Sequence, residues 1–283
     1  MTTQIDKVNS YYNATVIDYK TLWTGSQDLA MHFGYYDEEI KTHKESLLMM
    51  NKVLASFVHI TKKDIVLDAG CGYGGSALWL AKNIGCSAVG ITVVPYQLHQ
   101  ARNCANEIGL ASKVRFELED FSHTSFRKNT FTVVWGLESI VHAENKKDFV
   151  TEAFRVLKPK GRIIISEYML RETPTLSGKE RSIITPWLKG WAMPSLLTVK
   201  EYARLLKEAG FVRIQVHDIT DKTKPSLKRL GRLASFGFPI AKLLHSLKLL
   251  GTDHFGNIEA SYYQKLALEK GLWKYIVIIA MKK

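Results

Sequence analysis

Apolar residues change their spacing near residue 64, and this change separates two parts of the chain. Before it, apolar positions recur every three or four residues, which predicts helices rich in aromatic side chains. After it, short apolar runs alternate with stretches of helical period, which is typical of an α/β protein with a parallel sheet. The pattern predicts strands over 65–68, 88–92, 114–119, 131–135, 162–166, 211–217 and 272–280.

A glycine-rich turn follows the first predicted strand. The run Ile65-Val66-Leu67 stops at Asp68, and four glycines lie within residues 70–75. A helical period starts at Ser76, so the turn leads into a helix. Because glycine has no Cβ, backbone N–H groups there can approach a ligand closely. The motif predicts an adenosine-like ligand, and taken alone it would also permit a dinucleotide.

Composition excludes several classes of protein. A chain of 283 residues, 46% hydrophobic and 23% charged, is typical of a globular protein. No apolar run approaches the roughly 20 residues that span a bilayer, and the first residues lack the pattern of a signal peptide. The three cysteines show no metal-ligand spacing, which favours reduced thiols. We therefore expect a cytoplasmic protein without a metal site.

The net charge of +12 raises the question of a nucleic-acid partner. Basic residues are densest between Lys222 and Lys248, where acidic residues are absent and leucines recur at helical spacing. This amphipathic pattern suits a membrane surface, an anionic substrate or a solvated helix face. It lacks the interleaved aromatic residues of a single-strand binder. We expect no nucleic-acid partner and keep peripheral membrane contact as a possibility.

Several stretches together resemble the class I S-adenosylmethionine-dependent methyltransferases. The resemblance runs from about Tyr11 to the end of the chain, and its motifs are residues 66–75, 90–92, 118–121, 135–142 and 155–162. Within the class, residues 32–36 and 90–97 are most similar to the branch that holds tocopherol, sarcosine/dimethylglycine, sterol, alkaloid and geranyl diphosphate methyltransferases.

The resemblance implies a Rossmann-like, seven-stranded methyltransferase sheet, and the hydrophobic pattern divides the chain around it. We expect a helical N-terminal lid over residues 1–60 and the cofactor-binding α/β core over 61–221. An inserted helical substrate cap is expected over 222–265, and the final strand of the core over 266–283.

The resemblance also implies S-adenosylmethionine as the cofactor. Asp68 and the glycine turn would hold its methionine and ribose parts, and Tyr19 would close over the methionine carboxylate. Many members of the class carry an acid at the end of the second strand, whereas this chain has Thr92 there. That departure leaves the ribose contact open. The predicted cofactor-binding residues are Tyr19, Asp68, Gly70, Gly72, Thr92, Gln97, Glu119, Asp120, Phe121 and Trp135.

Three residues are candidates for the catalytic site. His142 follows Glu138 by four positions, so the two would share a face if this segment were helical. Its titration range suits a base near neutral pH, although cofactor contact or packing would also explain a histidine here. Glu167, at the end of the fifth predicted strand, is a second candidate base, since the geranyl diphosphate relatives imply a glutamate in this general region.

The acceptor of the methyl group is predicted from the apolar segments around the core. The leucines of 222–265 and the tryptophans of 187–194 favour a small lipophilic metabolite, such as an alkaloid or prenylated phenol, methylated at N or O. An alternative is C-methylation of a prenyl diphosphate or terpenoid, with lysines binding the diphosphate. A third possibility is a non-catalytic cofactor-binding or membrane-associated partner protein. No Asn/Asp-Pro-Pro-aromatic run follows the fourth strand, so the sequence does not indicate methylation of nucleic-acid bases.

Overall fold

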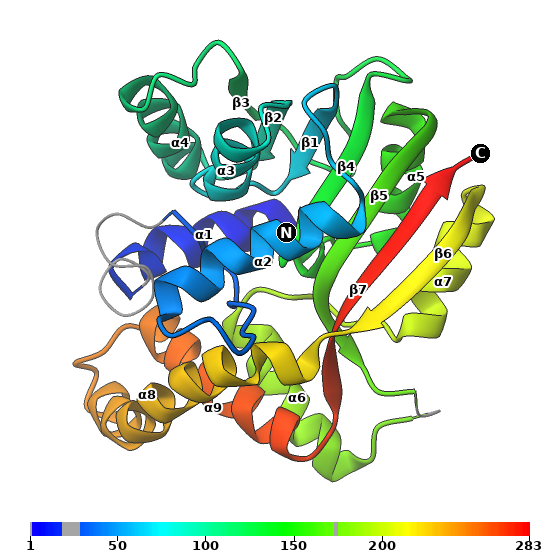
Figure 1. The fold of residues 1–283 in the computed structure, drawn as a ribbon. Helices are drawn as coiled ribbons and strands as arrows, with labels where there is room; N and C mark the ends of the chain where they lie inside the picture. Colours follow the sequence, from blue (N-terminus) through cyan, green and yellow to red (C-terminus); the bar gives the residue numbers. More distant parts are fainter. Residues whose placement is uncertain (1, 19–28, 173–174) are drawn as a thin grey trace.

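The computed structural model describes residues 2–18, 29–172 and 175–283 (Figure 1). Its seven strands form one sheet in the order β3-β2-β1-β4-β5-β7-β6. The strands are β1 Ile65–Ala69, β2 Ser87–Thr92, β3 Val114–Leu118, β4 Phe131–Leu137, β5 Leu157–Leu170, β6 Phe211–Asp218 and β7 Trp273–Lys282. The expected α/β methyltransferase sheet is confirmed, and six strands lie close to the predicted positions, whereas β5 extends well beyond the predicted 162–166 on both sides.

The last strand departs from the expected parallel sheet. Strands β1 to β5 pair in parallel, but β7 runs antiparallel to both β5 and β6. The chain leaves β6 at the carboxyl edge of the sheet and forms two helices, α8 Thr220–Ser246 and α9 Thr252–Glu269, which pair with each other. It then re-enters from that same edge, so β7 has to run in the opposite direction.

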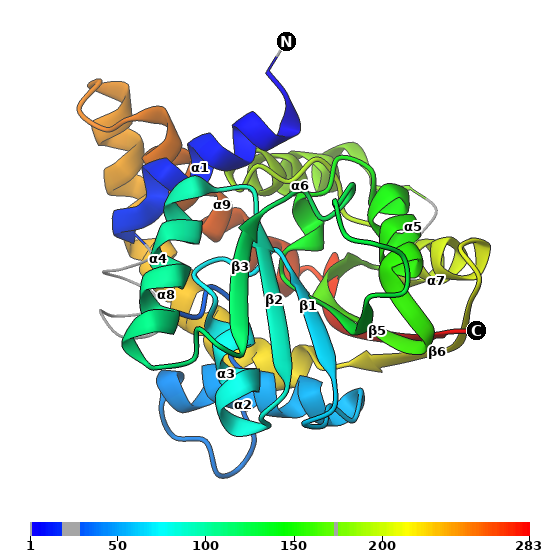
Figure 2. The ribbon, with the colours of Figure 1, turned by 90° about the horizontal axis from the view of Figure 1, so that it is seen from above.

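Helices cover both faces of the sheet (Figures 1 and 2). On one face, the core is built from α2 His43–Phe57, α3 Gly75–Asn83 and α4 Pro95–Glu107, together with the buried side chains of the strands that they cover. On the other face, α5 Lys146–Val156 and α7 Val199–Glu208 pack in a second apolar cluster. Alternate strand residues point into the two clusters, for example Val66 into the first and Leu67 into the second.

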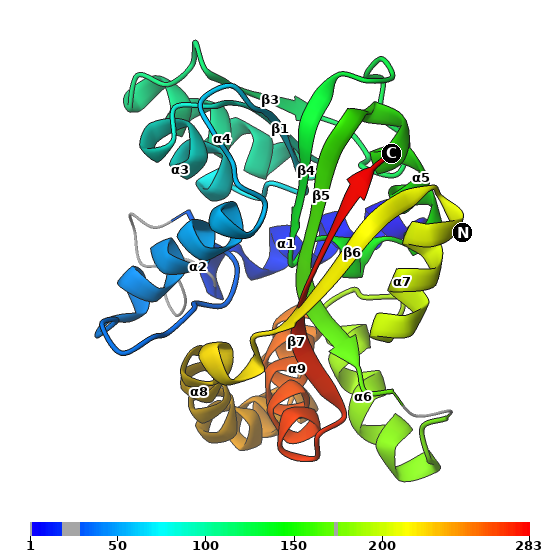
Figure 3. The same cartoon turned by 45° about the vertical axis from the view of Figure 1, so that its right-hand side comes forward.

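The remaining helices gather beyond the carboxyl ends of the strands (Figure 3). They are α1 Gln4–Asp18, α6 Gly178–Gly190, α8 and α9. Helices α6 and α9 approach closely where two glycines meet: a Cβ on Gly190 would lie 2.1 Å from the carbonyl oxygen of Gly256. None of the described helices combines the length and the apolar composition needed to cross a bilayer.

Candidate active site

The glycine turn after β1 folds back onto β2. The N–H groups of Gly70 and Cys71 both donate to the carbonyl oxygen of Ile91, at 3.0 and 2.8 Å. Gly70 has a φ of +84°, and a Cβ there would lie 2.4 Å from the Cβ of Ser139. An L side chain is therefore excluded both by the backbone conformation and by the neighbour, which explains the glycine.

A cavity of about 280 Å³ opens at this turn. It lies where the sheet order reverses between β1 and β4, which is where open α/β sheets bind ligands. Its lining includes seven of the predicted cofactor-binding residues: Asp68, Gly70, Gly72, Thr92, Gln97, Asp120 and Phe121. We call it the first cavity.

Asp68 brings an unpaired carboxylate oxygen to the first cavity. The residue is only 3% exposed, and no residue that the structure describes hydrogen-bonds its Oδ2 atom. Burial raises the pKa of Asp68 to about 7, and the N–H of Ala77 in the first turn of α3 acts in the opposite direction. A buried acceptor without a donor is costly. The cationic amino group of S-adenosylmethionine would supply the missing donor, so the residues present fit this cofactor.

Thr92 and Gln97 form a pair where related proteins often carry an acid. The Thr92 hydroxyl donates to Gln97 Oε1 at 2.8 Å, and both side chains are buried in the cavity wall. The Gln97 Nε2 atom lies 3.8 Å from the sulfur of Met31. The wall at the end of β2 is therefore neutral, with an amide in the place of a carboxylate.

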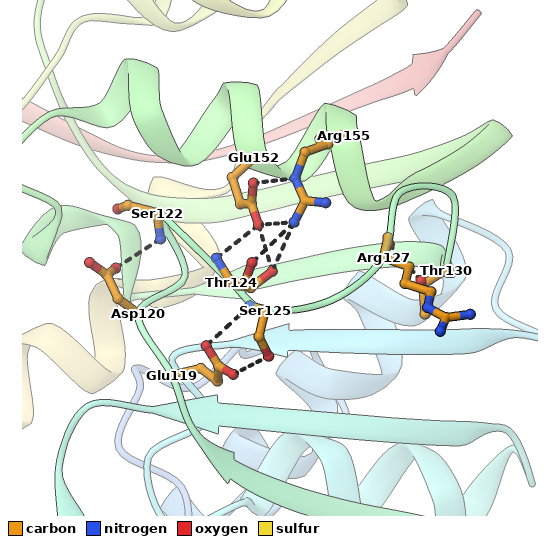
Figure 4. A network of polar contacts seen from close by, with 9 residues as sticks. All are labelled: Glu119, Asp120, Ser122, Thr124, Ser125, Arg127, Thr130, Glu152 and Arg155. Atoms are coloured by element: carbon orange, nitrogen blue, oxygen red, sulfur yellow. Dashed lines mark hydrogen bonds and ion pairs between the residues drawn. The ribbon is translucent and has the colours of Figure 1, made fainter.

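The loop after β3 forms another wall and is held by a polar network (Figure 4). The Asp120 carboxylate accepts from the N–H of Ser122 at 2.8 Å and borders the cavity. Glu119 instead accepts from the Ser125 hydroxyl at 2.5 Å and does not line the first cavity. The assignment of Glu119 to the cofactor stays a prediction that the cavity lining does not support, because its carboxylate is turned along the loop.

Two further predicted contacts do not reach the first cavity. Trp135 is fully buried in the first apolar cluster and lines neither cavity, so its assignment to the cofactor stays a prediction that the cavity lining does not support. Its side chain lies on the same face of β4 as that of Leu137, two positions further on, but deeper in the core. Tyr19 lies outside the described residues.

A second cavity, of about 180 Å³, adjoins the first. The two share Tyr12, Met31, Glu138 and His142. The other lining residues come from α1, the segment before α2, the turn after β4, β5, the segment after α6, and the helices α8 and α9, and most are aromatic or aliphatic. They are Tyr11, Asp18, Phe33, Val141, Tyr168, Trp191, Met193, Leu230, Leu233, Ala234, Gly237, Asn257, Ile258 and Ser261.

Glu138 and His142 reach the junction of the cavities through a turn and not through an α-helix. Glu138 has a φ of +51°, and Ile140–His142 form a short 3-10 helix. The prediction of a shared α-helical face is therefore wrong, although both side chains do line both cavities. The left-handed conformation of Glu138 has no sequence signal, since it occurs at a non-glycine residue.

Glu138 accepts three hydrogen bonds that tie together distant parts of the chain. The N–H of Phe33 and the hydroxyl of Tyr275 donate to Oε1, at 2.6 and 2.5 Å, and the hydroxyl of Tyr168 donates to Oε2 at 2.7 Å. Burial raises the pKa of Glu138 to about 7, while these donors lower it. With its oxygens engaged in this way, Glu138 holds the aromatic wall of the second cavity in place.

His142 pairs with Tyr12, which is not among the site residues predicted from the sequence. Its Nε2 atom lies 3.0 Å from Tyr12 Oη, and its Nδ1 atom lies 3.4 Å from the carbonyl oxygen of Ala192. Burial lowers the pKa of His142 to about 4, so the ring is neutral at pH 7. A neutral ring with Nδ1–H toward Ala192 leaves Nε2 as an acceptor for the Tyr12 hydroxyl.

Glu167 lies outside both cavities and supports the His142 turn. It is 1% exposed, and its carboxylate accepts from the hydroxyl of Tyr202. The Lys146 ammonium beside it donates to the carbonyl oxygens of Val141, Ala143 and Ser195, at 2.9 to 3.0 Å. Because Glu167 lines neither cavity, its assignment as a base stays a prediction that this geometry does not support. Lys146 had no sequence signal, because a lysine after a turn usually faces solvent.

Within the described ranges, no group of three or more histidine, cysteine, aspartate or glutamate residues has the arrangement of a metal site.

Comparisons with known proteins are consistent with this geometry. Residues 67–165 match the model of a methyltransferase domain. The chain is 28% identical to the tocopherol O-methyltransferase of Arabidopsis thaliana, over 97% of this chain and 81% of the relative. It is 32% identical to a sterol 24-C-methyltransferase of Schizosaccharomyces pombe, over 78% of this chain and 57% of that relative, and so spans a little over half of it.

A solved structure shows how widely the fold is used. The cyclase SpnF superposes with a TM-score of 0.77 at 21% identity, over 99% of this chain and 97% of that one. At this identity the likeness establishes the fold and not the reaction. The reaction class follows from the domain match and the curated relatives: this chain is a class I S-adenosylmethionine-dependent methyltransferase that acts on small molecules.

Proposed function

We propose that the enzyme methylates N or O of a small, lipophilic metabolite, and that the second cavity holds this acceptor. The observation that carries the proposal is the contact between the two cavities at Tyr12, Met31, Glu138 and His142. With the cofactor in the first cavity, its methyl group would face an aromatic chamber across these side chains. Catalysis would depend mainly on alignment, for which about 7–11 kcal/mol is available in well-oriented reactions.

The charge of the second cavity argues against a prenyl diphosphate as the acceptor. None of its described lining residues is a lysine or an arginine, and two of them, Asp18 and Glu138, are acidic. A diphosphate would need cationic partners. The cavity suits a phenol, an indole or an amine instead, because aromatic faces attract both apolar rings and cations.

C-methylation of a terpenoid or sterol without a diphosphate remains the second candidate. Its support is the similarity to a sterol 24-C-methyltransferase together with the apolar lining. The tocopherol O-methyltransferase, a relative matched over more of its length, supports an oxygen acceptor.

We assign proton removal to Tyr12 and His142. S-adenosylmethionine supplies an electrophilic methyl group, and a phenol or ammonium acceptor has to lose a proton as it receives that group. The Tyr12 oxygen can accept this proton while its own hydroxyl proton passes to His142 Nε2, 3.0 Å away. His142 is neutral at pH 7, because burial lowers its pKa to about 4, so Nε2 can accept a proton; a pKa this low makes it a weaker base than the sequence-based expectation of titration near neutral pH.

We also propose roles for the outer segments. Residues 1–60 would act as a lid, since the described part of α1 lines both cavities. Residues 222–265 would act as a substrate cap, because α8 and α9 contribute Leu230, Ala234 and Ile258 to the second cavity alone.

A labelled-methyl assay tests the proposal with four acceptors of similar size: a prenylated phenol, an indole alkaloid, a sterol-like terpenoid and geranyl diphosphate. We expect product from the phenol or the alkaloid and none from the diphosphate. Methylation of geranyl diphosphate alone would refute the acceptor class, and product mass spectrometry would identify the methylated atom. Calorimetric binding of S-adenosylmethionine in the same preparation separates a wrong acceptor from a protein that does not bind the cofactor.

A further inference from the structure

The second half of α8 exposes a row of large apolar side chains. Phe236 is 80% exposed, Ile240 62%, Leu243 60% and Leu247 57%, and Leu249 in the turn to α9 is 72% exposed. At about 100° per residue, the four side chains before the turn fall within roughly 60° of one another around the helix axis. A contiguous apolar surface of this kind marks an interaction site. We call these five residues the α8 apolar row.

The opposite side of α8 already packs against the rest of the protein. Its buried residues include Leu227, Gly231, Ala234 and Ala241. A Cβ on Gly231 would lie 2.7 Å from the Lys265 side chain of α9, which shows how closely the two helices approach. The helix therefore has two apolar sides. One packs against the rest of the described chain, and the other is exposed. Figures 1 and 3 show α8 at the edge of the molecule.

Exposed cations lie along the same helix, three of them before the α8 apolar row and two within its span. Lys224, Lys228, Arg232, Lys242 and Lys248 are exposed, and residues 222–248 include no aspartate or glutamate. The acidic groups near the two ends are Asp221, whose carboxylate pairs with Lys224 at 2.5 Å, and Asp253 in the first turn of α9. The row and its surroundings thus combine apolar side chains with a net positive charge.

We propose that the second half of α8 and the turn to α9 dock on a membrane surface that contains anionic lipids. The helix would lie in the plane of the interface, with the apolar row among the acyl chains and the lysines among the headgroups. A second copy of this chain fits the same surface poorly. Symmetric pairing would bring two sets of cations together on proteins that each carry a net charge of +12.

The same helix connects this surface with the second cavity. Leu233 is 43% exposed next to the apolar row, and it also lines the second cavity. A lipophilic acceptor dissolved in the membrane would thus enter past Leu233 without crossing water. This delivery step rests on the proposed function, whereas the docking itself does not.

Flotation of the full chain with vesicles tests the docking. Vesicles of phosphatidylcholine mixed with phosphatidylglycerol should carry the protein upward, and pure phosphatidylcholine should carry far less. The double variant Phe236→Ser/Ile240→Ser should lower the partition coefficient about tenfold or more, since two large apolar anchors are lost. Lys242→Gln/Lys248→Gln should lower binding to anionic vesicles and weaken its dependence on salt.

A matched control comes from exposed apolar residues elsewhere on the molecule. Leu48 on α2 is 46% exposed and Ile108 after α4 is 49% exposed, so Leu48→Ser/Ile108→Ser removes similar groups from another surface. This control should bind vesicles like the unaltered protein, and calorimetric cofactor binding should be unchanged in every variant. No flotation of the unaltered protein, or equal losses in the α8 variant and the control, would overturn the proposal. A dimer that dissociates only in Phe236→Ser/Ile240→Ser, without flotation, would assign the surface to a second copy and also overturn it.

Discussion

Asp68→Asn tests the cofactor site, because the change keeps the shape of the side chain and removes its charge. In the folded chain, burial raises the pKa of Asp68 from 3.8 to about 7. Below about pH 4 the Asp68 carboxyl is protonated in both the folded and the unfolded state. Between about pH 4 and pH 7 it loses its proton in the unfolded state only. The unliganded enzyme therefore loses stability as the pH rises through this range, on the order of 4 kcal/mol in full.

Binding of S-adenosylmethionine should offset the cost of ionising Asp68 in the folded enzyme. Its cationic amino group pairs with the ionised form of Asp68, so affinity for S-adenosylmethionine should fall as the pH drops below about 7, by up to tenfold per pH unit. Asp68→Asn should show no such fall. At pH of about 7.5 it should bind about 10- to 100-fold more weakly, because a hydrogen bond to a charged group contributes about 1.5–3 kcal/mol. The unliganded variant should unfold at a higher temperature than the unaltered enzyme, by a margin that shrinks toward acid pH.

Calorimetric titration and thermal unfolding between about pH 5.5 and 7.5 measure both effects. Asp120→Asn is the matched control, since Asp120 lines the same cavity but accepts a hydrogen bond from Ser122. It should keep the pH dependence of cofactor affinity. If the cofactor affinity of Asp68→Asn depends on pH in the same way as that of the unaltered enzyme, the role given to the unpaired Oδ2 of Asp68 is refuted.

Three further predictions concern the turn and the residues around it. Gly70→Ala should abolish cofactor binding and destabilise the fold, because φ is +84° and the new Cβ would lie 2.4 Å from the Cβ of Ser139. Gly109→Ala is the control: φ is +70° but no atom lies near the new Cβ, so the free energy of unfolding from a thermal melt should fall by only about 1 kcal/mol. Tyr12→Phe and His142→Gln should each lower kcat for a phenolic acceptor about 10²- to 10⁴-fold while cofactor affinity changes little, and an effect on KM alone would contradict a role in proton removal. Lys146→Met should lower the free energy of unfolding by about 3 kcal/mol or more, since three carbonyl oxygens lose their donor, and an unchanged denaturation curve would contradict this.

The parts of the site that depend on local backbone geometry could be predicted from the sequence. An apolar run that ends at Asp68, followed by Gly70 and Gly72, specifies a strand and a tight turn within a few residues. All three residues line the first cavity. The sheet was predictable for the same reason, because each strand is an apolar run bounded by turn residues. The direction of β7 was not, since it depends on where the preceding helices pack.

The orientation of single side chains near the motifs was harder to predict. Trp135 is separated by two residues from Leu137, which lines the first cavity, and Glu119 immediately precedes Asp120. Trp135 and Leu137 point to the same face of β4, and they differ in depth: Leu137 ends the strand at the cavity, whereas Trp135 lies inside the core. Glu119 and Asp120 lie in the loop after β3, where the turns of the backbone, and not strand alternation, set the direction of each side chain. The motif predicted the segment, and it did not predict which of its side chains line the cavity.

The second cavity was the least predictable part, because its wall is assembled from distant segments. Tyr12 on α1, Trp191 after α6 and Asn257 on α9 line one cavity, and the Asn257 side chain accepts from Trp191 Nε1 at 3.0 Å. No spacing in the sequence relates positions so far apart. The apolar residues of 187–194 and 222–265 predicted an apolar environment for the acceptor, but not which side chains meet in one cavity.

The turn at residues 138–142 shows why the two cavities form one site. Glu138 is bonded to β5, β7 and the segment at Phe33, whereas His142 is bonded to α1 and to the segment after α6. Both residues belong to the same short turn after β4, so a shift of that turn would move the walls of both cavities together. Lys146 and Glu167 hold the turn from the side away from the ligands. Under the proposed function, substitutions on α8 and α9, whose side chains line the second cavity, would change the acceptor, while the turn would keep His142 between the two cavities.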